Sequence, residues 1–196
     1  MLASITPLGE RGRRSSWGVT VVAFLLGSTA AALAAGAAAG GLGELAVPGG
    51  LSGAARFGAL AGAGLAATLI DALRDPVPGP RRQVDERWLD RYRGWVYGLG
   101  FGAQLGLGVT TVVSSAALYV ALLAALLSAD PAAGAAIIGA FGLARGLTPL
   151  AAARVRRPEQ LLALHAGLLR WRERTRRLVL VATAAIAALA VLAGVS

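Results

Sequence analysis

Long stretches of the chain carry no charged residue and consist mainly of alanine, leucine, valine and glycine. Three of them run from Trp17 to Gly43, from Leu107 to Ala129 and from Leu178 to Ser196. A helix needs about 20 residues to cross the hydrocarbon core of a bilayer, and apolar runs of 18 or more residues indicate such helices. The pattern therefore predicts an integral membrane protein.

Polar segments divide the apolar sequence into five predicted spans, so the predicted fold is an all-α, polytopic transmembrane helical bundle forming one domain. The first apolar run has 27 residues. A cleavable signal sequence has an apolar core of about 7–15 residues, so we interpret this run as a retained span. The spans lie at about 17–43, 52–73, 94–128, 131–153 and 178–196, with an N-terminal tail at 1–16 and charged loops at 74–93 and 154–177.

A weak internal similarity relates the first two spans to the third and fourth. Gly18-Val19-Thr20 recurs as Gly108-Val109-Thr110, and "RFGALAG" from Arg56 resembles "AFGLARG" from Ala140. Two explanations stand, a parallel two-span repeat or chance similarity in a chain rich in glycine and alanine.

The arginines predict the orientation. The chain has no lysine, and 17 of its 19 basic residues lie in the tail 1–16 and in the loops 74–93 and 154–177. Basic residues concentrate in cytoplasmic loops. We therefore expect a multi-pass protein of the bacterial inner membrane, with its N-terminus inside and its C-terminus outside. The net charge of +9 then reflects topology and contacts with anionic lipid headgroups, and no nucleic-acid partner is expected.

The segment "RGWVYGLGFGAQLGLGVTT" contains glycines at every fourth position. Residues four apart share one face of a helix, and a glycine face lets another helix approach closely. A phosphate-binding loop of the Walker type needs a lysine, which the chain lacks. The spacing therefore predicts glycine-packed helices, with the row Gly94, Gly98, Gly102 and Gly106 and the pairs Gly36/Gly40, Gly58/Gly62 and Gly142/Gly146.

The third apolar segment, 94–128, is long for a single span. As one helix its 35 residues would measure about 52 Å, against a hydrocarbon core of about 30 Å. Two structures satisfy the sequence. We favour one long tilted helix, and the alternative is a break near Gly106–Gly108, where transporters often place binding sites.

Composition excludes much chemistry. The chain has no cysteine and one histidine, His165. Disulfides, thiol redox chemistry, cysteine-ligated metals and a Ser-His-Asp triad are not expected. We predict a protein that is not an enzyme and holds no metal or cofactor.

Arg145 is the main candidate functional residue. It lies about 13 Å into the fourth span, where a charge costs roughly 2.5–3.5 kcal/mol and needs a partner. Gln104 is predicted at a similar depth. Two interpretations remain: a structural arginine bonded to Gln104 or backbone carbonyls, or a site for a small anionic or polar solute. The predicted substrate-binding residues are Arg145, Gln104, Thr110, Thr111 and Ser114.

Other polar residues are predicted near the membrane boundaries. Asp71, at the end of the second span, is expected to be interfacial or to reach Arg145. Arg56 is expected to extend towards headgroups. The segment 158–177, with Pro158, apolar residues at 3-4 spacing and a cluster of arginines, predicts an amphipathic interfacial helix on anionic lipid. A helix that docks a partner protein is the alternative.

"YGLGFGAQLGLGVTT" resembles the glycine-rich transmembrane segments of the DsbD/CcdA family, which carries reducing equivalents across bacterial membranes during cytochrome c maturation. Gly100-Phe101 and Leu105-Gly106 match the family's short patterns. The redox cysteine is missing here, with Thr110 and Thr111 nearby, and the family has six spans. The resemblance implies a distant relation without thiol chemistry, and no active-site residue transfers.

The leading hypothesis is therefore a carrier-like inner-membrane protein for a small anionic or polar solute. The alternative is a non-catalytic membrane subunit or assembly factor, related to cytochrome c biogenesis if the resemblance holds, which docks a partner through its arginine-rich loops. A homo-oligomer or a complex with a membrane partner subunit fits either hypothesis.

Overall fold

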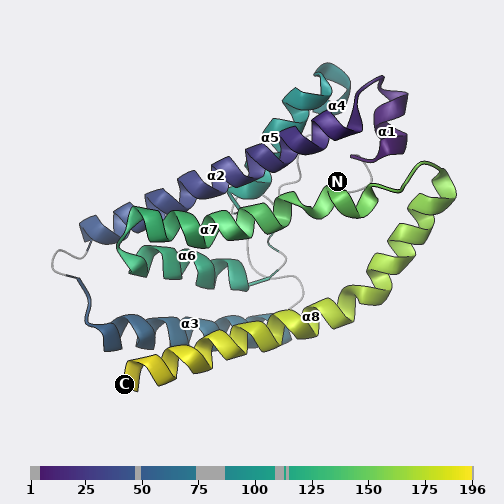
Figure 1. Cartoon of the computed structure of the whole chain (residues 1–196). Coiled ribbons are helices and arrows are strands. Elements are labelled where there is room, and N and C mark those ends of the chain that lie inside the picture. Colours follow the sequence, from purple (N-terminus) through teal and green to yellow (C-terminus); the bar gives the residue numbers. More distant parts are fainter. Residues whose placement is uncertain (1–4, 47–49, 74–86, 109–112, 114, 196) are drawn as a thin grey trace. The chain divides into compact units, whose positions relative to one another are not determined.

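A computed structural model of the chain describes residues 5–46, 50–73, 87–108, 113 and 115–195. Every regular element in these ranges is helical (Figure 1). In chain order they are α1 (Pro7–Gly12), α2 (Trp17–Ala46), α3 (Gly53–Leu73), α4 (Trp88–Arg91), α5 (Gly94–Gly106), α6 (Ala117–Ser128), α7 (Pro131–Gly146), the short 3-10 helix η1 (Thr148–Ala152) and α8 (Pro158–Val195).

Four helical segments of the described chain are long and apolar enough to cross a membrane. They are Trp17–Ala46, Gly53–Leu73, Pro131–Ala152 and Pro158–Val195, and α6 is a shorter apolar helix. The prediction of an all-helical fold is confirmed for the described residues, and four of their helices are candidate membrane spans. The count of five spans and the orientation stay predictions.

The third apolar segment is not one continuous helix, contrary to the structure favoured from the sequence. α5 ends at Gly106 and α6 begins at Ala117 (Figure 1). Gly108 has a φ of 71°, a left-handed conformation that glycine adopts without strain and that ends a right-handed helix. The break therefore lies near Gly106–Gly108, the position given by the alternative interpretation of the sequence.

The arginine-rich segment 158–177 is also not a separate interfacial helix. It forms the first half of α8, which continues unbroken to Val195 (Figure 1).

The N-terminal tail contains a helix, α1, where no element was expected. Thr6 caps α1 by accepting a hydrogen bond from the amide of Gly9 (3.0 Å), and Pro7 occupies the first turn.

The chain folds as two compact units, each built from three separate stretches of sequence. The first comprises Met1–Ala32, Arg81–Thr111 and Gly139–Arg172, and the second comprises Leu33–Pro80, Val112–Ile138 and Glu173–Ser196.

In the first unit, α5 packs against the N-terminal half of α2 along the glycine row. A Cβ at Gly98, Gly102 or Gly106 would collide with the α2 backbone, at Thr20, Phe24 and Ser28 respectively. Gly142 of α7 also lies close to α2, where a Cβ would collide with the side chain of Ala32 and lie 2.9 Å from the carbonyl oxygen of Ser28. The core beside this contact comprises Ile5, Val21, Phe24, Leu89, Tyr97 and Phe101.

In the second unit, the C-terminal half of α2 packs against α7, and α3 packs against α6 and α8. Gly36 lies against Gly134, and Gly64 against Ala187. Not every predicted glycine pair makes such a contact. A Cβ added at Gly58 or Gly62 would have nothing within 4 Å, so the prediction of a packed face is wrong for this pair.

Candidate functional site

The most elaborate polar cluster in the first unit surrounds Glu10 of α1, which is completely buried. The hydroxyl of Tyr97 lies within hydrogen-bond distance of both carboxylate oxygens. The hydroxyl of Thr20 donates to Oε2 (2.9 Å), and Nη2 of Arg13 donates to Oε1 (3.0 Å). Burying a carboxylate is costly unless donors satisfy it, and here three side chains supply them.

Glycines on α5 allow this cluster to form. A Cβ at Gly94 would lie 2.5 Å from the Thr20 hydroxyl oxygen, and one at Gly98 would lie 2.6 Å from the Thr20 carbonyl oxygen. Because neither has a side chain, α5 approaches α2 closely enough for Tyr97 and Thr20 to reach the same carboxylate. The glycine row thereby positions the polar cluster as well as the helices.

Arg13 completes the charge balance of the cluster. Its guanidinium carbon lies 5.8 Å from the centroid of the Tyr97 ring, and it forms an ion pair with Glu10. Burial alone would lower the pKa of Arg13, but hydrogen bonds with Glu10 and Tyr97 outweigh it and the pKa is raised. Arg13 therefore stays charged, and the cluster ties α1 to α2 and α5.

Asp71 forms the corresponding polar contact in the second unit. Its carboxylate is buried and accepts from the hydroxyl of Ser115 (2.7 Å) and the amide of Ala116 (2.8 Å). Asp71 thus caps the start of α6 across the helix packing, and its position at a membrane interface stays a prediction. Arg176 donates to the carbonyls of Asp71 (3.0 Å) and Ala72 (2.8 Å), which lie in the last turn of α3.

The predicted site around Arg145 is only partly within the described residues. Arg145 is half-buried near the end of α7, and its guanidinium carbon lies 5.4 Å from the centroid of the Phe141 ring. This aromatic contact is what the described residues show for the guanidinium. Gln104 is half-buried on α5. Thr110, Thr111 and Ser114 lie outside the described residues.

Pro149 has the backbone effect expected for a proline after Arg145. A proline cannot donate to the carbonyl four residues earlier, so the carbonyl of Arg145 needs another donor. The hydroxyl of Thr148 provides it at 2.7 Å. The carbonyl of Arg145 is therefore satisfied within the turn between α7 and η1. The pairing of the Arg145 side chain with Gln104 stays a prediction.

Sequence reasoning missed Glu10 and Tyr97. The signal for Glu10 was the order Thr6-Pro7 followed by an acidic residue, which is typical of a helix start. Tyr97 lies between glycines of the row on α5, and it is fully buried. Among the described residues no group of three or more histidine, cysteine, aspartate or glutamate side chains is placed to hold a metal ion.

Comparison with known proteins finds similarity to three proteins called methylamine utilization protein MauF. The chain is 41% identical over 86 residues to that of Paracoccus versutus, covering 43% of this chain and 31% of the relative. The Paracoccus denitrificans protein is 40% identical over 86 residues, which cover 43% of this chain and 31% of the relative. The Methylophilus methylotrophus protein is 37% identical over 101 residues, which cover 52% of this chain and 34% of the relative.

The matches cover about a third of each relative's length. No family model matches the chain, and no solved structure matches it. The similarity is to proteins that bear the name MauF rather than a DsbD/CcdA name, and the resemblance to the DsbD/CcdA family stays a prediction.

Proposed function

We propose that this chain is a membrane-embedded, non-catalytic accessory protein of an amine-utilization system, and that it holds a partner protein in place at the membrane. The similarity to three methylamine utilization proteins at 37–41% identity carries this proposal. It favours the accessory role over the carrier that the sequence first suggested.

The geometry of the polar residues agrees with a scaffold. The carboxylates of Glu10 and Asp71 are satisfied by side chains and amides that connect helices within a unit. Ser28 donates to the carbonyl of Gly142 at 2.7 Å, which joins α2 to α7. The guanidinium of Arg145, the residue that the carrier hypothesis assigns to the solute, lies over the ring of Phe141.

The exposed first half of α8 is the surface we assign to the partner. Leu162 and Leu169 are 72% and 70% exposed, and they are seven residues apart on one face of the helix. Both precede Leu178, where the uncharged part of the helix begins. Exposed leucines that share one face of a helix indicate a surface that a partner covers.

Arginines follow this apolar face along the same helix. Arg170, Arg172 and Arg174 are exposed, with Glu173 the one acid among them. A helix with exposed leucines followed by guanidinium groups suits a partner that presents an apolar groove with an acidic rim. The partner class is therefore an acidic protein at the membrane surface on the side predicted to be cytoplasmic.

Deletion of the gene in its own host tests the proposal. The deletion strain should fail to grow with methylamine as the nitrogen source and grow normally with ammonium, and the wild-type gene on a plasmid should restore growth. Equal growth of the deletion strain on methylamine would refute the proposed function.

Variants of α8 test the docking surface. The double substitution Leu162→Asp/Leu169→Asp should fail to restore growth while the protein is inserted at wild-type level, because both side chains are exposed and not part of the fold's core. Arg156→Glu, an exposed charge change before α8, is the control and should restore growth. If the double variant restores growth but loses affinity for anionic vesicles, the surface binds lipid rather than a partner.

A further inference from the structure

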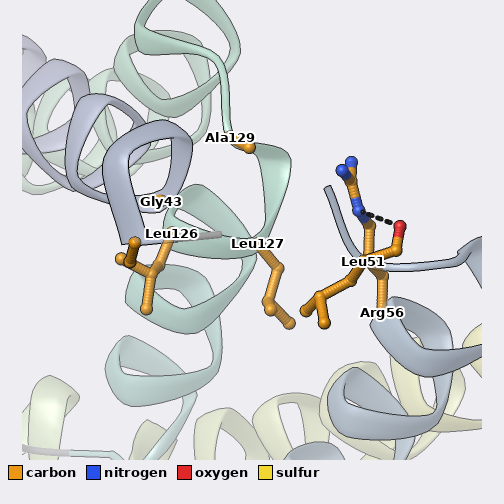
Figure 2. A pocket seen from close by; sticks show the side chains of 7 residues that line it. Gly43, Leu51, Arg56, Leu126, Leu127 and Ala129 are labelled. Atoms are coloured by element: carbon orange, nitrogen blue, oxygen red, sulfur yellow. Dashed lines mark hydrogen bonds between the residues drawn. The ribbon is translucent and has the colours of Figure 1, made fainter. Parts of the chain in front are cut away.

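A small cavity lies in the second unit at one end of three helices (Figure 2). Its volume is about 60 Å³, which accommodates several water-sized groups. One charged side chain, Arg56, is part of an otherwise apolar lining. The lining residues are Gly43 and Ala46 at the end of α2, Leu51 and Arg56 at the start of α3, and Leu126, Leu127 and Ala129 at the end of α6.

Backbone groups of the preceding loop hold the guanidinium of Arg56 in one orientation. Its Nε donates to the carbonyl of Leu51 at 3.1 Å, the bond drawn in Figure 2. Nη2 lies against Gly50, where a Cβ would be 2.9 Å away, and Gly50 has a φ of 76° that favours glycine. Within the described part of the chain the two terminal nitrogens have no hydrogen-bond partner, so they are available to a ligand.

The packing of α3 on α8 gives the depth of Arg56 in a bilayer. Gly194 lies against Phe57, and Arg176 bonds the carbonyl of Asp71 at the opposite end of α3. The 21 residues of α3 measure about 31 Å, which matches the hydrocarbon core. Arg56 therefore lies at one boundary of the membrane, and Arg176 lies at the other.

We propose that Arg56 and this cavity form a binding site for one glycerophospholipid. The phosphate diester accepts hydrogen bonds from the two terminal nitrogens of Arg56, whose planar fork matches two phosphate oxygens. The first part of an acyl chain lies over Leu51 and Leu127 and fills the cavity. Water fills an apolar cavity poorly because it lacks hydrogen-bond partners there, whereas a chain regains the dispersion contacts that an empty cavity loses.

Native mass spectrometry of the purified full chain with added phosphatidylglycerol tests the phosphate contact. Wild-type protein should retain one lipid, and Arg56→Gln should weaken its retention about tenfold or more, since hydrogen bonds to a charged group are lost. Arg56→Lys keeps the charge but not the planar fork and should also bind more weakly. Arg177→Gln, at an exposed arginine paired with Glu173, is the control and should bind as wild type does. Equal retention by wild type and Arg56→Gln would overturn the proposal.

A second comparison tests the acyl chain. Wild-type protein should bind a long-chain phosphatidylglycerol more tightly than a short-chain one, and Leu127→Trp, which fills the cavity, should remove this preference. Inorganic phosphate competing as well as the lipid would show a free-anion site instead and would overturn the lipid assignment. A long-chain preference that is unchanged in Leu127→Trp would also contradict it.

Discussion

Substituting alanine for Gly102 tests the packing of α5 on α2 most sharply, because the added methyl group would meet backbone rather than a movable side chain. A Cβ at this position would lie 2.9 Å from the carbonyl carbon of Phe24 and from the amide nitrogen of Ser28, and nearer still to the Phe24 oxygen. Nonbonded atoms prefer about 3.5 Å or more, so the helices must separate by about 0.6 Å or more. Overpacking of this kind costs about 1–3 kcal/mol.

The same substitution at Gly62 provides the matched control. Gly62 lies in the middle of α3, is exposed, and has nothing within 4 Å of a Cβ position. There the lower backbone entropy of alanine should stabilise the helix by about 0.5–1 kcal/mol. The two substitutions therefore change stability in opposite directions.

Thermal or denaturant unfolding of the purified protein in a mild detergent, followed by circular dichroism, measures both variants. We expect Gly102→Ala to unfold at a lower temperature than wild type and Gly62→Ala at the same or a higher one. If Gly102→Ala is as stable as Gly62→Ala, the close approach of α5 to α2 is wrong.

Three further predictions follow from the polar clusters and the topology. Glu10→Gln should lower the free energy of unfolding by about 2–3 kcal/mol, because Arg13 loses its buried counter-charge, and the same unfolding assay should detect it; a change below about 0.5 kcal/mol would contradict the role of the cluster. Asp71→Ala should cost about 1–2 kcal/mol through the lost cap of α6, while Asp130→Ala at the exposed turn before α7 should cost less. A reporter fused after Ser196 should be active in the periplasm and inactive in the cytoplasm, and the reverse result would contradict the predicted orientation.

The apolar elements of this chain could be predicted from sequence because membrane solvation acts on each helix separately. The length of segment 94–128 raised a break as the alternative, but the favoured prediction of one long tilted helix was wrong. The choice of a break required the backbone conformation at Gly108, which spacing alone does not supply. At Leu178 the sequence changes from arginines to apolar residues. Such a change indicates a membrane boundary, but it does not show where a helix ends. The helix α8 continues through Leu178 to Val195.

Contacts that depend on which helix face meets which neighbouring helix could not be predicted from the sequence. Gly102 and Gly62 each belong to a four-residue glycine spacing, yet Gly102 faces α2 while Gly62 is exposed. Spacing shows that residues share a face, but not whether another helix covers it. The same limit applies to Glu10, whose burial depends on Tyr97, 87 residues later in the chain. The three predicted site residues beyond Gly108 lie outside the described residues, so the candidate site was only partly accessible.

Uptake of radiolabelled methylamine by the deletion strain tests the central claim most directly, because it separates an accessory role from transport. Cells should be supplied with methylamine, and uptake over the first seconds should be compared with growth over many hours. The proposed accessory role predicts that initial uptake equals that of wild-type cells while growth on methylamine is lost. Loss of initial uptake in the deletion strain, restored by the wild-type gene, would instead identify the chain as a carrier and contradict the account.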